Sequence, residues 1–223
     1  MPEYQQTAAL WSRGALEHEF GVRPADIEWH MERTEDRSHG GETGFKAPPG
    51  VTVKFIPAEK NIGTMMASGE LDATVLYITD PNAVDRSRID LRKDPNVKTL
   101  FPSPGAEGVR YYQKTGLYPI NHGVVVKRSV LEKHPWVAIN LYKMFAEARD
   151  RVAARTRELM GVYFDLGLVP ADSRAALSID PYPYGVRENR KVLETIAEYS
   201  HEQGLTPRRV GLEEVFAAST MEL

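Results

Sequence analysis

Two histidines stand where acid–base chemistry could occur. His39 lies in Ser38-His39-Gly40-Gly41, where glycines let the backbone approach a ligand closely and an imidazole exchanges protons near neutral pH. An exposed histidine in a polar loop explains the same residues equally well. His122 precedes a run of valines, which indicates a buried strand entry, and a hydrogen-bonded structural histidine is at least as good an explanation there. His39 and His122 are therefore the candidate proton donors.

Basic and aromatic side chains also suggest recognition of an acid. Arg110 is followed by Tyr111 and Tyr112, and this combination joins a guanidinium that binds carboxylates in a bidentate manner to rings that stack on a flat ligand. A solvated arginine beside two packing tyrosines is the alternative. Arg33 and Lys60 are further candidate carboxylate partners, although lone basic residues are commonly solvated surface.

Standard catalytic motifs are absent from the sequence. It contains no HExxH, P-loop, GxGxxG or G-x-S-x-G pattern. Glu32, Asp36 and His39 leave room for a divalent metal ion, but their spacing does not establish a site. The sequence thus requires no cofactor, and we assign no metal ligand.

The elements that would position these residues alternate between helix and strand. Residues 6–20 predict a helix that ends at Gly21, and residues 61–68 predict a second helix capped by Asn61. Strands are expected at 27–31, 51–56 and 71–78. This order predicts an α/β fold with a mostly parallel sheet covered by helices.

The second half is richer in helices than in strands. Residues 118–128 (YPINHGVVVKR) predict one strand, a short helical turn starts at Ser129, and amphipathic helices are expected from Pro135 through Val152 and over 187–201. A single strand does not provide enough sheet surface for these helices to pack against. We therefore expect missing amino-terminal sequence or another chain to complete that sheet.

A general rule selects the residues nearest a ligand. In open α/β sheets, ligands bind outside the carboxyl ends of the strands, where helix amino termini also lie. The rule selects Tyr4, Gln5, Gln6, Thr7, residues 32–41, Lys60, Asn61, Tyr77 and Thr79. For residues 4–7, which precede or begin the first helix, a plain helix cap is the alternative to ligand contact.

Composition limits the class of partner. The 223 residues carry a net charge of -3 with scattered Lys and Arg, which argues against nucleic acid as a partner. No apolar run approaches the ~20 residues of a membrane-spanning helix, and the start lacks a secretory signal, so no membrane insertion is expected. The absence of cysteine excludes a disulfide or a thiolate nucleophile.

Several strings resemble the 4,5-dihydroxyphthalate decarboxylase family, whose members share the two-lobed fold of type II periplasmic solute-binding proteins. These strings are PEYQQTAALWSRG, RSHGGETGFKAPPGV, IGTMMASGELDAT, YYQKTGLYPINHGVVVKRSVLEKHPWVA and PYPYGVRENRKVLETIAEYSHEQGL. The resemblance covers the whole chain but only the later part of the usual family length, so the chain looks truncated. It implies a complete second lobe at 1–117 and a hinge strand with a partial first lobe at 118–223.

The resemblance implies a decarboxylase of a dihydroxylated aromatic diacid. His39 or His122 would protonate the ring carbon that bears the carboxylate, Arg110 would hold the retained carboxylate, and Tyr77 or Tyr112 would orient the ring hydroxyls. A catechol of this kind could itself chelate a divalent metal ion. The expected substrate-binding residues are Tyr4, Gln5, Gln6, Thr7, Arg33, Lys60, Tyr77, Arg110, Tyr112 and Asn121.

The same fold resemblance allows a second function. A non-catalytic solute-binding protein of an ABC-type uptake system would close its lobes on a small organic acid. An enzyme would be expected in the cytoplasm, and a binding protein with a missing signal in the periplasm. A homo-oligomer that completes the truncated lobe is a third expectation.

Overall fold

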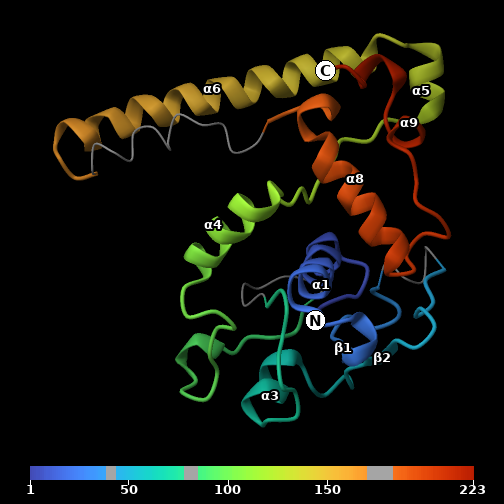
Figure 1. The fold of residues 1–223 in the computed structure, drawn as a ribbon, viewed down its shortest axis with the longest axis vertical. Helices are drawn as coiled ribbons and strands as arrows, with labels where there is room; N and C mark the ends of the chain where they lie inside the picture. The colour runs from blue at the N-terminus through green and yellow to red at the C-terminus, as the bar shows by residue number, and fades with distance from the viewer. Residues whose placement is uncertain (39–43, 78–84, 170–182) are drawn as a thin grey trace. The chain divides into compact units, whose positions relative to one another are not determined.

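A computed structural model describes residues 1–38, 44–77, 85–169 and 183–223 (Figure 1). The chain divides into two compact units, the first made of 1–121 with 194–210 and the second of 122–193 with 211–223. The two-lobed fold and the boundary after residue 117 stay predictions.

The first unit begins with helix α1, Thr7–Phe20. Its inner face buries Ala9, Leu10 and Trp11. Gly21 ends the helix in the left-handed conformation, with φ 70°, and its N–H donates to carbonyls of the last turn. Glycine adopts this conformation without the steric cost of a side chain. The helix predicted over 6–20 is therefore confirmed.

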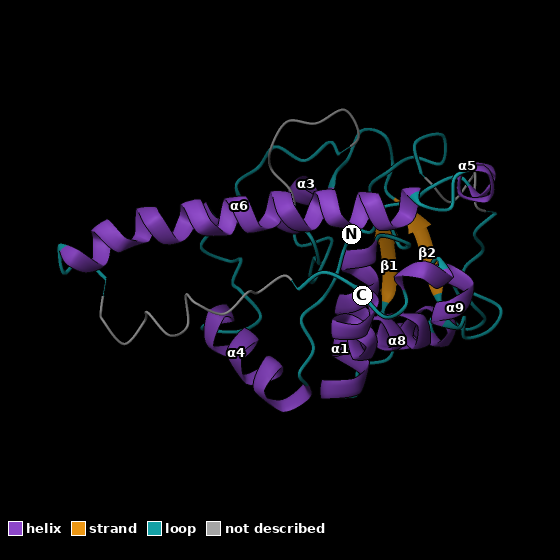
Figure 2. Ribbon diagram, turned by 90° about the horizontal axis from the view of Figure 1, so that it is seen from above, coloured by secondary structure: helices purple, strands orange, loops and turns teal. Residues whose placement is uncertain are grey.

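Among the residues of this unit that the structure describes, two short parallel strands form a sheet (Figure 2). Strand β1, Glu28–Met31, pairs with β2, Thr52–Phe55, in a register that places Glu28 opposite Thr52. Trp29 and Met31 are buried against Met1, Tyr4 and Ala9. Alternate residues of a strand point to opposite faces, so these two side chains attach β1 to the residues at the start of α1.

Helix α3, Ile62–Ala67, follows β2. The side chain of Asn61 accepts a hydrogen bond from the Thr64 N–H at 2.9 Å, which satisfies one of the free donors of the first turn. Ile62 and Met65 are buried with Ile56, which follows β2. The predicted helix with its Asn61 cap is confirmed, although it ends at Ala67 rather than Ser68.

The strand predicted over 71–78 is not formed by the described residues 71–77, so that prediction was wrong. Leu76 has φ 56°, a left-handed conformation that a strand does not contain. The apolar side chains still find partners: Leu71 and Tyr77 pack on the Ile56 cluster, and Val75 packs on the cluster that contains Trp29. An apolar run thus packs against the core without joining the sheet.

Helix α4, Pro104–Thr115, also belongs to the first unit. Ser103 caps its start, with Oγ accepting from the Ala106 N–H at 3.4 Å. Short 3-10 turns lie at Pro24–Asp26 (η1) and Leu91–Lys93 (η2). From residue 194 on, helix α8, Val186–Glu202, also belongs to this unit.

The second unit is helical in its described part. It contains α5, Arg128–Lys133, the long α6, Val137–Asp165, the start of α8, α9, Leu212–Val215, and the 3-10 turn η3, Ala218–Thr220. Helix α6 packs against α5 and η3. The predicted helices from Ser129, Pro135 and residue 187 are confirmed, and their starts differ from the predicted ones by one or two residues. The helix predicted to reach Val152 continues to Asp165. None of the described helices combines the length and apolar character that crossing a membrane requires.

The strand predicted over 118–128 is absent, and that prediction was wrong. Val125 is 94% exposed and Val124 59% exposed, while Arg128 already begins α5. Branched apolar residues favour a strand only when a neighbouring strand offers hydrogen bonds and side-chain contacts. No described segment pairs with this one.

The packing of α1 on α8 gives a prediction. A Cβ atom at Gly14 would overlap the ring of Tyr199, which is itself buried. We expect Gly14→Ala to lower the free energy of unfolding by about 2 kcal/mol, because well-packed cores resist added atoms. Urea denaturation measures the change.

Gly108→Ala is the matched control, since Gly108 lies inside α4 and a Cβ there would meet no atom within 4 Å. Alanine is the better helix former, so the control should be neutral or stabilising. Equal stability of Gly14→Ala and the native protein would contradict the close packing.

Candidate functional site

A hollow of about 310 Å³ opens at the carboxyl ends of the two parallel strands. Glu32 follows β1 directly, and Ala58 lies three residues beyond β2. Parallel strands place their carboxyl ends at the same edge, which is where ligands bind in open α/β sheets. The lining residues are Glu32, Thr34, Asp36, Arg37, Ala58 and Arg86.

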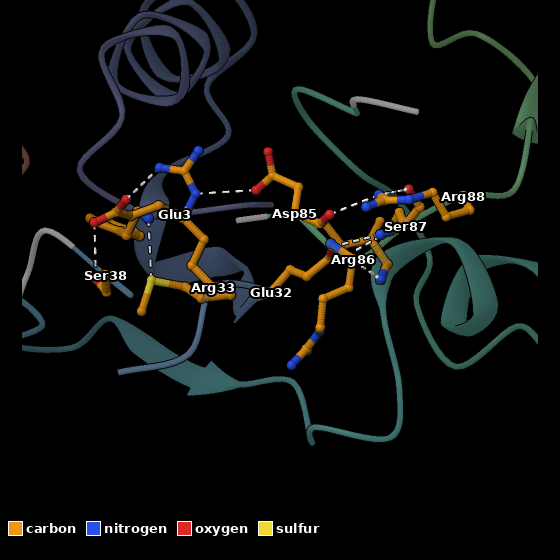
Figure 3. Close-up of polar contacts among 11 residues, drawn as sticks. Glu3, Glu32, Arg33, Ser38, Asp85, Arg86, Ser87 and Arg88 are labelled. Carbon is orange, nitrogen blue, oxygen red and sulfur yellow. Dashed lines mark hydrogen bonds and ion pairs between the residues drawn. The ribbon is translucent and has the colours of Figure 1, made fainter. Parts of the chain in front are cut away.

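Glu32 is the centre of a buried hydrogen-bond network (Figure 3). Its side chain is buried, with 1% exposed, and its carboxylate accepts from the Ile62 N–H at 2.7 Å, the Ser87 N–H at 2.9 Å and the Ser87 hydroxyl at 2.6 Å. The Arg86 N–H donates to the same carboxylate. One side chain therefore joins the end of β1 to the start of α3 and to residues 86–87.

The network determines the charge state of Glu32. Burial alone raises the pKa of this carboxyl, but the hydrogen bonds from Ser87, Ile62 and Arg86 outweigh it, and the pKa lies below its ordinary value of 4.5. Hydrogen bonds to the charged form favour ionisation. Glu32 is consequently an anion whose charge is balanced by protein donors.

A second network surrounds the neighbouring residue, Arg33. Its guanidinium donates to Glu3 at 2.9 Å and to Asp85 at 3.1 Å, and the Ser38 hydroxyl donates to the other oxygen of Glu3 at 2.9 Å. Both carboxylates are buried. Burial lowers the pKa of Arg33, yet these hydrogen bonds raise it overall, so the group is a fixed cation.

The predicted ligand residues before α1 lie mostly inside the protein. Tyr4 is fully buried, its ring 3.7 Å from the Arg13 guanidinium carbon and stacked on Phe45. Gln5, Gln6 and Thr7 are half-buried. Hydrogen-bond partners for the Tyr4 hydroxyl and the Gln6 Oε1 are missing among the described residues.

Other predicted residues are already paired with protein groups. Lys60 forms an ion pair with Glu70, and Arg110 binds Glu107 at 2.6 Å and Glu19 at 3.2 Å. Tyr77 donates to the Ile89 carbonyl at 2.6 Å. Burial raises the pKa of Tyr77, and its hydroxyl also interacts with Ser87, which places it beside the Glu32 network.

Four predicted residues are exposed: Arg110, Tyr112, Asn121 and His122. His122 was expected at a buried strand entry, and that expectation was wrong because the strand does not form. His39 and Thr79 lie outside the described residues. Their roles, and the role of every other predicted ligand residue, stay predictions.

Among the residues that line the hollow, the sequence patterns selected neither Ala58 nor Arg86. Arg86 is the charged residue of these two. Its position depends on a hydrogen bond to Glu32 across 54 residues, and no local pattern signals such a contact. Across the described residues, no three His, Asp or Glu side chains are grouped as metal ligands.

Replacing Glu32 tests the network. In Glu32→Gln the amide NH₂ would face N–H donors, so buried donors would lose their acceptor. We expect the free energy of unfolding at neutral pH to fall by about 3 kcal/mol, measured by urea denaturation. Glu59→Gln is the control, because Glu59 is exposed, and should change stability by less than about 0.5 kcal/mol.

The direction of the pKa shift adds a pH dependence. The folded pKa lies below the ordinary 4.5, so the contribution of Glu32 is complete above that value and is lost as the pH falls through the folded pKa. The stability difference between native protein and Glu32→Gln should therefore narrow in acid. A difference that does not change with pH would contradict an ionised Glu32.

Comparison with known proteins gives two curated relatives. The chain is 30% identical over its whole length to the 4,5-dihydroxyphthalate decarboxylase of Comamonas testosteroni, of which it covers 66%. It is 36% identical over 75 residues, 34% of the chain and 29% of the relative, to the protein of the same name from Pseudomonas putida. No family model matches the chain. The chain spans 66% of the length of its Comamonas relative, and this similarity supports its membership of the 4,5-dihydroxyphthalate decarboxylase family.

Proposed function

We propose that the protein decarboxylates a dihydroxylated aromatic diacid similar to 4,5-dihydroxyphthalate. The observation that carries the proposal is the 30% identity over the whole chain to a relative of that name. The hollow at the strand ends supports it, since 310 Å³ falls within the ~300–1,000 Å³ of small-molecule sites. Arg37 and Arg86 in its wall suit an anionic ligand.

The chemistry that we propose is protonation of the ring. The hydroxyl groups make the ring electron-rich, so an acid can add a proton to the carbon that bears one carboxylate. The bond to the carboxylate then breaks, carbon dioxide leaves, and the bonding electron pair restores aromaticity. The net reaction consumes one proton and one carboxylate and yields carbon dioxide and a ring C–H group.

Roles for individual residues extend this proposal. His39 or His122 would supply the proton, because an imidazolium is an effective acid near neutral pH. The proposed clamp, Arg110, is engaged by Glu107 and Glu19, so it would have to exchange these partners for a substrate carboxylate. Tyr77 lies beside the Glu32 network and would orient a ring hydroxyl.

Incubation of the purified native protein with 4,5-dihydroxyphthalate tests the reaction. We expect release of one equivalent of carbon dioxide and formation of 3,4-dihydroxybenzoate. Chromatography of the reaction mixture measures the 3,4-dihydroxybenzoate. Phthalate, which lacks the hydroxyl groups that activate the ring, is the control and should release none. Binding of 4,5-dihydroxyphthalate without turnover would contradict the proposal and favour the solute-binding function.

Histidine variants test the proton donor. We expect His39→Ala or His122→Ala to lower kcat by about 10²–10⁴-fold, the usual contribution of general acid catalysis. His201→Gln serves as the control, because His201 is exposed near the end of α8, and should keep native kcat. Full activity in both alanine variants would exclude a histidine acid.

A further inference from the structure

The side chain of Arg86 is held less firmly than its backbone. The backbone N–H donates to the buried Glu32 carboxylate, and both sequence neighbours, Asp85 and Ser87, are buried and hydrogen-bonded. The guanidinium, in contrast, donates through Nη2 to the carbonyls of Ile56 and Pro57, each at 3.3 Å. The residue is fixed in place while its charged end has only long contacts.

One donor of this guanidinium has no acceptor. Arg86 Nε is buried and lacks a hydrogen-bond partner among the described residues. A buried donor without an acceptor costs roughly 1–3 kcal/mol. Because Nε and Nη2 lie on the same side of the guanidinium, a carboxylate can bind both in a bidentate manner. If the guanidinium turned away from these two carbonyls toward the hollow, an incoming carboxylate would satisfy Nε and replace the two long contacts.

The remaining charges of the hollow permit an anion there. The negative charge of Glu32 is balanced by its hydrogen-bond donors, so it opposes an anionic ligand less than an unpaired carboxylate would. Asp36 faces Arg37 at 3.9 Å in an exposed pair, which is weak. Arg86 is a cation of the wall whose backbone N–H bonds directly to the balanced Glu32 carboxylate.

We propose that Arg86 binds a carboxylate of the aromatic diacid in the hollow at the carboxyl ends of β1 and β2, as a specificity-determining residue. The identity of the diacid rests on the proposed function. The binding role itself rests on the long contacts of the guanidinium, the unsatisfied Nε and the position of the residue in the wall. This binding role predicts that the protein also binds an aromatic dicarboxylate that cannot undergo the reaction.

Calorimetric titration of the native protein with phthalate tests this role. We expect Arg86→Gln to weaken phthalate binding at least 10-fold and Arg86→Lys to weaken it less, because lysine keeps the charge but not the fork of donors. Arg92→Gln is the matched control: it removes one positive charge from an 85% exposed side chain paired with Asp90 and should bind within about twofold of native protein.

The substitution keeps the backbone N–H that reaches Glu32, so Arg86→Gln should fold normally, which circular dichroism and the thermal midpoint verify. Native binding by Arg86→Gln, or no phthalate binding by the native protein at millimolar concentration, would overturn the inference. If Arg86→Gln released carbon dioxide from 4,5-dihydroxyphthalate as the native protein does, the role of Arg86 would be overturned while the proposed function would stand. Arg86-dependent binding without carbon dioxide release would support the inference and refute the proposed function.

Discussion

The carboxylate of Glu32 is the interaction on which the rest of the first unit depends. Buried backbone N–H groups need acceptors, and those of Ile62, Arg86 and Ser87 find theirs in this one side chain. A helix start and an irregular loop cannot supply such acceptors from their own backbone. Because the sheet has two described strands, the wall of the hollow is held by a side chain more than by strand pairing.

Glu32 and Arg33 act together on the segment 85–87. Arg33 holds Asp85 through its guanidinium, and Glu32 holds the backbone of Arg86 and Ser87. Two adjacent residues of opposite charge thus fix one loop at three consecutive positions. Buried ion pairs contribute little net stability once desolvation is counted, but they specify one arrangement of the groups they join. What this pair specifies is the position of Arg86.

The sequence predicted the helices better than the strands, for a physical reason. Signals for α1 and α3 lie within a few residues: Gly21 provides a left-handed end, and Asn61 provides a cap. A strand exists only when a partner is beside it. The runs at 71–77 and 118–128 have strand-like composition, yet Leu76 turns into a left-handed conformation and Val125 faces solvent.

The same distinction applies to the candidate site. The rule that ligands bind at strand carboxyl ends selected residues 32–41, and Glu32, Thr34, Asp36 and Arg37 do line the hollow. Local composition was a weaker guide, since Arg110 beside two tyrosines resembled a clamp, but Glu107 one turn earlier and Glu19 on α1 bind its guanidinium. Arg86 carried no local signal, because a contact across 54 residues places it. The charge of an arginine can be foreseen from sequence, whereas the acceptors that engage it or leave it available are determined by the fold.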